Sequence, residues 1–232
     1  MVTIFGETDQ VRLLRRAASR LCDALRDVLA VRRHAIIAVP GGRSVVRIFE
    51  FMLQERLDWH RVHFFMVDER LVPADHPDSN FGLLREHLIE PLRREGRLES
   101  VNAHPFSFDT AEPGRGALEY GSILAEHGAS FDVVLLSAGE DGHVASLFPN
   151  HHSIDDARHG FFVMTDSPKP PPGRMSASAS LVRSAETAVL LFLDPAKAAA
   201  YENFQNPSVP LSSCPAKLVL AMKSAFVFTD LA

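Results

Sequence analysis

The sequence predicts an α/β fold in which helices flank a mostly parallel, open sheet. Short runs rich in β-branched and aromatic residues alternate with helical patterns along the chain, and this alternation is typical of βαβ units. The chain has 232 residues, of which 46% are hydrophobic and 23% charged. This is enough for one large α/β domain of ordinary globular composition. We therefore expect a single domain over residues 1–232.

A long amphipathic helix is predicted close to the amino terminus. Thr8 or Asp9 is suited to cap it, and the arginines that follow form its solvated face. The apolar positions recur at helical spacing: Val11, Leu14, Leu21, Leu25 and Val28.

Seven strands are expected after this helix, with further helices beginning after Ser44 and Ser79. In chain order the strand-like runs are 35–39, 62–67, 131–136, 161–164, 188–193, 218–221 and 226–228. They suit one open sheet with an edge or side extension. The proline-rich segment 167–174 is too short for a domain linker, and we expect a stiff loop beside a cleft.

The net charge and the cysteines indicate which binding partners and which cellular compartment to expect. The formal net charge of -5 gives no long-range attraction to nucleic acid or to an anionic membrane. Cys22 and Cys214 lack the spacing of metal ligands or of a disulfide framework, which favours structural thiols in a reducing compartment. The sequence has neither a secretory n-region nor an apolar run of membrane-spanning length. We expect a cytoplasmic protein with no nucleic-acid or membrane partner.

An acid and a histidine follow the apolar run 131–136. Ligands of parallel sheets bind outside the carboxyl ends of the strands, so Asp141 and His143 are expected to face a cleft. The alternative is a turn in which Asp141 only caps a following helix and His143 is solvated.

Two glycines follow the first predicted interior strand. Gly41 and Gly42 would let backbone amides approach a ligand before the helix near Ser44, and a helix amino terminus favours an anion such as phosphate. The alternative is an ordinary strand-to-helix turn, because the full dinucleotide and P-loop fingerprints are missing.

Charged residues lie at three further places where they would reach the same crevice. Asp68 and Arg70 directly follow the strand 62–67. The guanidinium of Arg70 suits a phosphate or carboxylate ligand. The alternative is an internal ion pair between Arg70 and Asp68. Lys197 follows the strand 188–193, and Lys169 and Arg174 flank the prolines. The alternative for Lys197 is an exposed position on a helix, and the alternative for Lys169 and Arg174 is a solvated linker.

Taken together, these strings resemble the 6-phosphogluconolactonase family, within the wider group that includes glucosamine-6-phosphate isomerase/deaminase. The resemblance spans nearly the whole chain and rests on residues in this order: Gly41, Gly42 and Ser44; Asp68 to Arg70, Val72, Pro73, Ser79 and Asn80; Gly139, Asp141 to His143 and Ala145 to Pro149; Ser167 to Pro170, Arg174, Lys197 and Ala198. It implies a modified Rossmann-like fold and hydrolysis of 6-phosphoglucono-δ-lactone to 6-phosphogluconate in the oxidative pentose phosphate pathway.

Lactone hydrolysis needs a positioned water, a base and donors for an oxyanion, and neither a metal nor a cofactor is required. On this reading His143 is the general base and Asp141 orients it or holds substrate hydroxyls. We expect a monomer or small homo-oligomer. The expected substrate and phosphate contacts are Gly41, Gly42, Ser44, Asp68, Arg70, Lys169, Arg174 and Lys197.

Four positions depart from the family pattern. Pro40 stands where Ser is common, Arg43 adds a cation beside the glycines, and Asp194 replaces a small residue. Arg183 stands where an Asn-like residue is typical.

Two rival functions remain open. The isomerase/deaminase branch has a Glu where this chain has Phe148, and commonly a Tyr at the position of Arg70, so both positions favour the lactonase. A sugar-phosphate sensor would keep the phosphate cradle without the chemistry. Such sensors are normally fused to a DNA-binding segment, and this chain has no basic recognition helix ahead of the fold.

Overall fold

The computed structural model describes residues 1–99, 102–108 and 111–231. Its centre is a six-stranded sheet in which every neighbouring pair is parallel. This confirms the predicted α/β class. In spatial order the strands are β1 (Val2–Gly6), β9 (Ser224–Thr229), β8 (Thr187–Phe192), β5 (Val133–Ser137), β2 (Ala35–Val39) and β3 (Val62–Met66).

The middle of the sheet is apolar because both of its faces are covered. Every residue of β2 is buried, as expected for a parallel strand with helices on both sides. Asp132, just before β5, ties that strand to β2: its carboxylate accepts a hydrogen bond from the backbone N–H of Ile36 (2.8 Å) and pairs with Arg32. Burial raises the pKa of this carboxyl group, although these two contacts oppose the rise.

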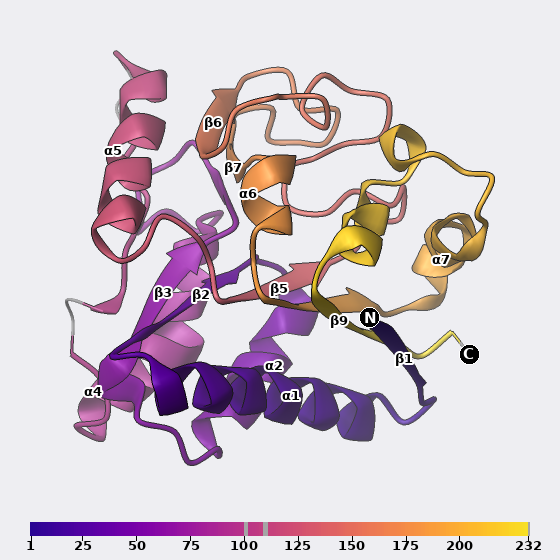
Figure 1. Cartoon of the computed structure of the whole chain (residues 1–232). Coiled ribbons are helices and arrows are strands. Elements are labelled where there is room, and N and C mark those ends of the chain that lie inside the picture. The colour runs from indigo at the N-terminus through magenta and orange to yellow at the C-terminus, as the bar shows by residue number, and fades with distance from the viewer. Residues whose placement is uncertain (100–101, 109–110, 232) are drawn as a thin grey trace.

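Helices cover the two faces of the sheet (Figure 1). The long helix α1 (Gln10–Val31) and α2 (Arg43–Leu53) pack side by side on one face, and α5 (Pro113–Glu126) and α6 (Ala179–Arg183) lie on the other. Asp9 caps α1 by accepting from the N–H groups of Val11 and Arg12. No helix in the described ranges is long and apolar enough to cross a membrane.

Shorter elements complete the chain. One irregular helical stretch follows Ser79, which caps it; it consists of α3 (Asn80–Leu84), a π-helical turn η2 (Arg85–Ile89) and α4 (Glu90–Arg94). The others are α7 (Ala198–Gln205) and the 3₁₀ segments η1 (Trp59–Arg61), η4 (Pro195–Lys197), η5 (Leu211–Ser213) and η6 (Pro215–Ala221).

A second sheet lies beyond the carboxyl end of β3. It is antiparallel, in the order β4 (Asp68–Arg70), β7 (Arg174–Ala177) and β6 (Phe161–Met164). The predicted run 161–164 is therefore a strand of a side extension and not of the parallel sheet. The strands β1, β4 and β7 are additions to the sequence-based prediction.

One predicted strand is wrong. Residues 218–221 lie in the 3₁₀ segment η6, where Leu218 and Val219 are buried against β8 and β9. A short apolar run has the same pattern whether it is a strand or a buried helical turn. Pro215 at the start of η6 fixes a backbone torsion compatible with a helical turn and donates no hydrogen bond to a ladder.

Candidate active site

A cavity of about 310 Å³ opens at the carboxyl ends of the parallel strands. The loops after β2 and β5, the short strand β4 and the loop ahead of β7 all contribute to its wall. Eight of the ten residues predicted from sequence line it: Gly41, Gly42, Asp68, Arg70, His143, Lys169, Arg174 and Lys197. Asp141 lies directly behind His143, and Ser44 lines a neighbouring cavity.

His143 and Asp141 form a tight pair at this wall. The ring Nδ1 lies 2.6 Å from Asp141 Oδ1, and the same oxygen accepts from the backbone N–H of His143 at 3.1 Å. Burial alone would raise the pKa of Asp141. The hydrogen bonds and charge of His143, aided by Lys169, outweigh that effect and lower the pKa to about 2. An ionised carboxylate only accepts, so Nδ1 carries the proton and Nε2 is the basic nitrogen of the neutral ring.

Glycines shape the loop that holds this pair. A Cβ on Gly139 would lie 2.0 Å from His143 Nδ1, so no other residue leaves room for the ring. Gly142 has φ of +87°, a conformation that favours glycine. The backbone closes on itself, with Gly139 donating to the His143 carbonyl and Gly142 donating to the Gly139 carbonyl. Asp141 therefore braces the histidine, and residues 144–147 form a turn rather than the capped helix of the alternative interpretation.

Asp68 lines the same cavity and belongs to a buried polar network. Its Oδ2 accepts from Ser146 Oγ at 3.0 Å, and Asn80 Nδ2 donates to its backbone carbonyl at 2.9 Å. Arg70 donates from Nη1 to the Asp78 carbonyl at 2.6 Å. These partners differ from the Asp68–Arg70 ion pair that the sequence left open. Because the Ser146 hydroxyl donates to a carboxylate and not to an imidazole, it is unsuited to act as a nucleophile.

Two residues that hold this part of the site in place, Glu69 and Asn80, are missing from the sequence-based site prediction. Glu69 is 2% exposed, and its carboxylate accepts from Ser79 Oγ and from the backbone N–H groups of Arg70, Asn80 and Phe81. Burial raises the pKa of Glu69 while these hydrogen bonds oppose the rise. Glu69 thus anchors the start of α3.

Asn80, placed by that anchor, explains why position 41 is glycine. A Cβ on Gly41 would lie 1.8 Å from Asn80 Oδ1, so the two loops can approach only if Gly41 has no side chain. The signal in the sequence was the acid pair at 68–69 followed by the cap residue Ser79 and Asn80.

Four cations surround the cavity. Arg174 is 6% exposed, and its guanidinium donates to the carbonyls of Pro170 and Pro171, each at 2.9 Å. Burial lowers its pKa, and the charge of Asp68 opposes this. Arg70, Lys169 and Lys197 are the other three. The first turn of α2 beside Gly42 has no side-chain cap, so the helix end adds to a field that suits a multiply charged anion.

A family model described as glucosamine-6-phosphate isomerases/6-phosphogluconolactonase matches residues 8–228. The chain belongs to this family. A 6-phosphogluconolactonase of Borreliella burgdorferi is 30% identical over 199 residues, which cover 86% of this chain and 85% of that protein. A 6-phosphogluconolactonase structure from Shewanella baltica has a TM-score of 0.83 at 26% identity and covers 99% of this chain and 97% of its own. One from Thermotoga maritima has a TM-score of 0.82 at 20% identity, covering 99% and 98%.

The structure shows where two of the four departures from the family pattern lie. Ser44 and Arg43 line a second cavity of about 610 Å³ that shares Gly42 and Lys197 with the first, so Arg43 lies outside the main cavity wall. Asp194 has φ of +85°, which explains why small, glycine-rich residues are usual there. Its side chain compensates by capping the N–H of Ala196 at 3.0 Å.

The other two are Pro40 and Arg183. Pro40 lines the main cavity next to Gly41. Arg183 is exposed in the last turn of α6, and nothing in the structure explains its difference from the family.

Proposed function

We propose that this protein hydrolyses 6-phosphoglucono-δ-lactone to 6-phosphogluconate in the oxidative pentose phosphate pathway, with His143 as the general base. The observation that carries the proposal is the 2.6 Å His143–Asp141 pair at the wall of a cavity ringed by four cations. Family membership and the names of the relatives support the activity. The cytoplasmic location and a monomeric or small homo-oligomeric state stay predictions from the sequence.

The proposed reaction uses Nε2 of His143. A water attacks the lactone carbonyl carbon while Nε2 takes one of its protons, giving a tetrahedral oxyanion and an imidazolium held by Asp141. Collapse of that intermediate breaks the bond between the carbonyl carbon and the ring oxygen. The imidazolium returns its proton to the departing oxygen, so the base is regenerated and one water is consumed. Cationic side chains around the cavity stabilise the oxyanion.

The phosphate is held by the cationic part of the same cavity. Arg70 and Arg174 offer planar guanidinium donors, and Lys197 offers a point charge. The uncapped start of α2 at Gly42 adds backbone N–H groups. Lys169 Nζ lies 3.9 Å from Asp141 Oδ2, so its charge is close to the His143–Asp141 pair.

The isomerase/deaminase reaction is less compatible with this site. That reaction needs a carboxylate in the proton relay, and here the matching position is Phe148, which is 1% exposed with its ring centroid 4.9 Å from that of His143. An apolar ring cannot carry a proton. Attack of water on a lactone carbonyl does not require a group at this position.

The decisive experiment compares freshly made lactone with glucosamine 6-phosphate as substrates. We expect lactone opening well above the spontaneous rate and neither ammonia nor ketose from the amino sugar. Deaminase activity that copurifies with the protein and disappears in His143→Ala would overturn the lactonase assignment. Inactivity on both compounds, with sugar phosphates still raising the melting temperature, would favour the sensor.

A further inference from the structure

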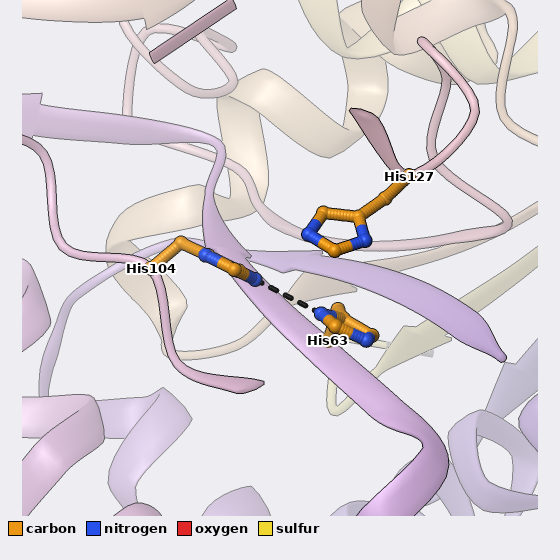
Figure 2. A group of neighbouring side chains, drawn as sticks. All are labelled: His63, His104 and His127. Atoms are coloured by element: carbon orange, nitrogen blue, oxygen red, sulfur yellow. Dashed lines mark hydrogen bonds between the residues drawn. The ribbon is translucent and has the colours of Figure 1, made fainter. Parts of the chain in front are cut away.

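Three histidines gather at the end of the sheet opposite the cavity, in a place that the proposed hydrolysis does not use. They are His63 on β3, His104 in the segment beside β3, and His127 at the carboxyl end of α5. Figure 2 shows the three rings converging from these separate parts of the chain. His63 is five residues before Asp68, or about 16 Å along an extended strand, so the cluster is separate from the cavity.

The nitrogen atoms are arranged as metal ligands would be. One ring nitrogen from each histidine lies within 4.8 Å of the other two, and His63 Nδ1 is 3.0 Å from His104 Nε2. A tetrahedral zinc ion with Zn–N bonds of about 2.0 to 2.1 Å separates its ligand nitrogens by about 3.3 Å. The first pair therefore needs to open by only a few tenths of an ångström. The His127 nitrogen lies within 4.8 Å of the other two, so it must come closer by at most about 1.5 Å to reach the tetrahedral spacing.

The backbone around the cluster is held firmly. The His104 N–H donates to the Phe64 carbonyl at 3.0 Å, its own carbonyl accepts from Tyr120 Oη at 2.9 Å, and its ring stacks on Phe65. The His127 carbonyl lies 2.8 Å from His34 Nε2. Such preorganisation reduces the ordering cost of binding a metal.

The rings are available as ligands in the neutral state. Burial, with repulsion from the neighbouring histidines, lowers the pKa values of His63 and His104 to about 4. Neutral imidazole is the form that binds metals. The ring that shares its proton in the His63–His104 hydrogen bond can move that proton to its other nitrogen, so binding requires no net proton release.

We propose that His63, His104 and His127 bind a divalent transition-metal ion of the zinc type, with water as the fourth ligand. Three imidazoles select Zn²⁺, Co²⁺, Ni²⁺ or Cu²⁺ over Mg²⁺ and Ca²⁺, which take oxygen ligands. The role is structural, because the ion would link β3, the segment beside it and the end of α5. The site is separate from the proposed hydrolysis, which does not require a metal.

The test uses chelator-treated full-length protein titrated with Co²⁺, whose visible absorption intensifies on tetrahedral coordination, and with Zn²⁺ by calorimetry. We expect one saturable equivalent of either ion, competition between them, and a higher melting temperature with Zn²⁺. Both His63→Gln and His127→Gln should weaken binding at least about tenfold, because loss of a ligand costs no less than loss of a residue that supports one. His127→Gln keeps the test valid if the strand variant fails to fold.

The matched control is His152→Gln. His152 belongs to the other group of possible metal ligands in the described chain, together with His151 and Asp166, and that group is more exposed. Metal binding should survive this change. Absence of saturable binding to the wild type, binding retained in both cluster variants, or binding lost in His152→Gln would overturn the proposal. None of these readouts depends on the lactonase assignment.

Discussion

At the scale of single residues, replacing His143 gives the most direct test of the proposed mechanism. His143→Ala removes a proton acceptor that acts in the transition state, so kcat should fall on the order of a hundredfold or more while KM changes little. Initial rates on fresh lactone, corrected for spontaneous opening, measure this. His152→Ala, an exposed histidine bonded to Asp166, serves as the control. Near-wild-type turnover in a folded His143→Ala protein would rule out the general-base role.

Catalysis should also be sensitive to substitution of Gly139, although this residue has no side chain. An added Cβ would meet the His143 ring at 2.0 Å, so Gly139→Ala must push the ring away from Asp141. We expect kcat to fall at least about tenfold, since small misplacement of a catalytic group is costly. Gly114→Ala is the matched change, because nothing lies within 4 Å of its Cβ. Equal activity of the two variants would show that the His143–Asp141 geometry is not needed.

Arg70 is expected to act on substrate capture. Loss of one charge-assisted phosphate contact costs about 1.5 to 3 kcal/mol in the ground state and the transition state alike. Arg70→Ala should therefore raise KM by about ten- to a hundredfold and leave kcat nearly unchanged. Steady-state kinetics, measured together with a melting curve, distinguish this role in substrate binding from a structural role of Arg70 through its hydrogen bond to the Asp78 carbonyl. Unchanged kinetics with a lower melting temperature would support the structural role.

At the scale of elements, the amino end of β3 should give the protein a pH-dependent stability. The pKa values of His63 and His104 are about 4 in the folded chain, against about 6.5 for an ordinary histidine. Between these values the unfolded chain binds more protons, so stability falls as pH drops from about 6.5 to about 4. His34 and His127 face the same rings.

Urea unfolding at several pH values with chelator present measures this effect. The double variant His63→Gln/His104→Gln should flatten the slope between those pH values, whereas His152→Gln should keep it. A wild-type slope in the double variant would assign the effect to other groups.

The elements that sequence patterns missed share a physical cause. The strand β1 lies at the sheet edge, where Ile4 is 46% exposed, so it lacks the continuous apolar signal of β2. The strands β4 and β7 are short and include charged Asp68, Arg70 and Arg174. They are strands only because they pair with each other across about a hundred residues, and no local pattern contains that pairing.

At the scale of the whole molecule, ligand binding should stabilise the fold because the cavity joins loops of the parallel sheet to the small sheet. At a hundred times its Kd, 6-phosphogluconate should add about 2.7 kcal/mol, or about 5 to 10 °C in melting temperature for a domain of this size. Thermal scans with gluconate, which lacks the phosphate, give the control. An equal shift in melting temperature with gluconate would show that the protein does not recognise the phosphate.

The sequence by itself determined the parallel α/β class and the strands at 35–39 and 161–164, because continuous apolar runs bounded by turns depend on local composition. It also predicted the strand at 62–67, one residue longer than β3. It also placed Asp141 and His143 after a buried strand, since chemistry at strand ends follows from the topology of parallel sheets. Only the tertiary structure decided that Asp141 holds the His143 ring, that Asn80 requires a glycine at position 41, and that Ser44 faces a neighbouring cavity. It alone brought His63, His104 and His127 together. These are contacts between loops far apart in the chain, and their geometry is set by how the sheets and helices pack rather than by spacing along the sequence.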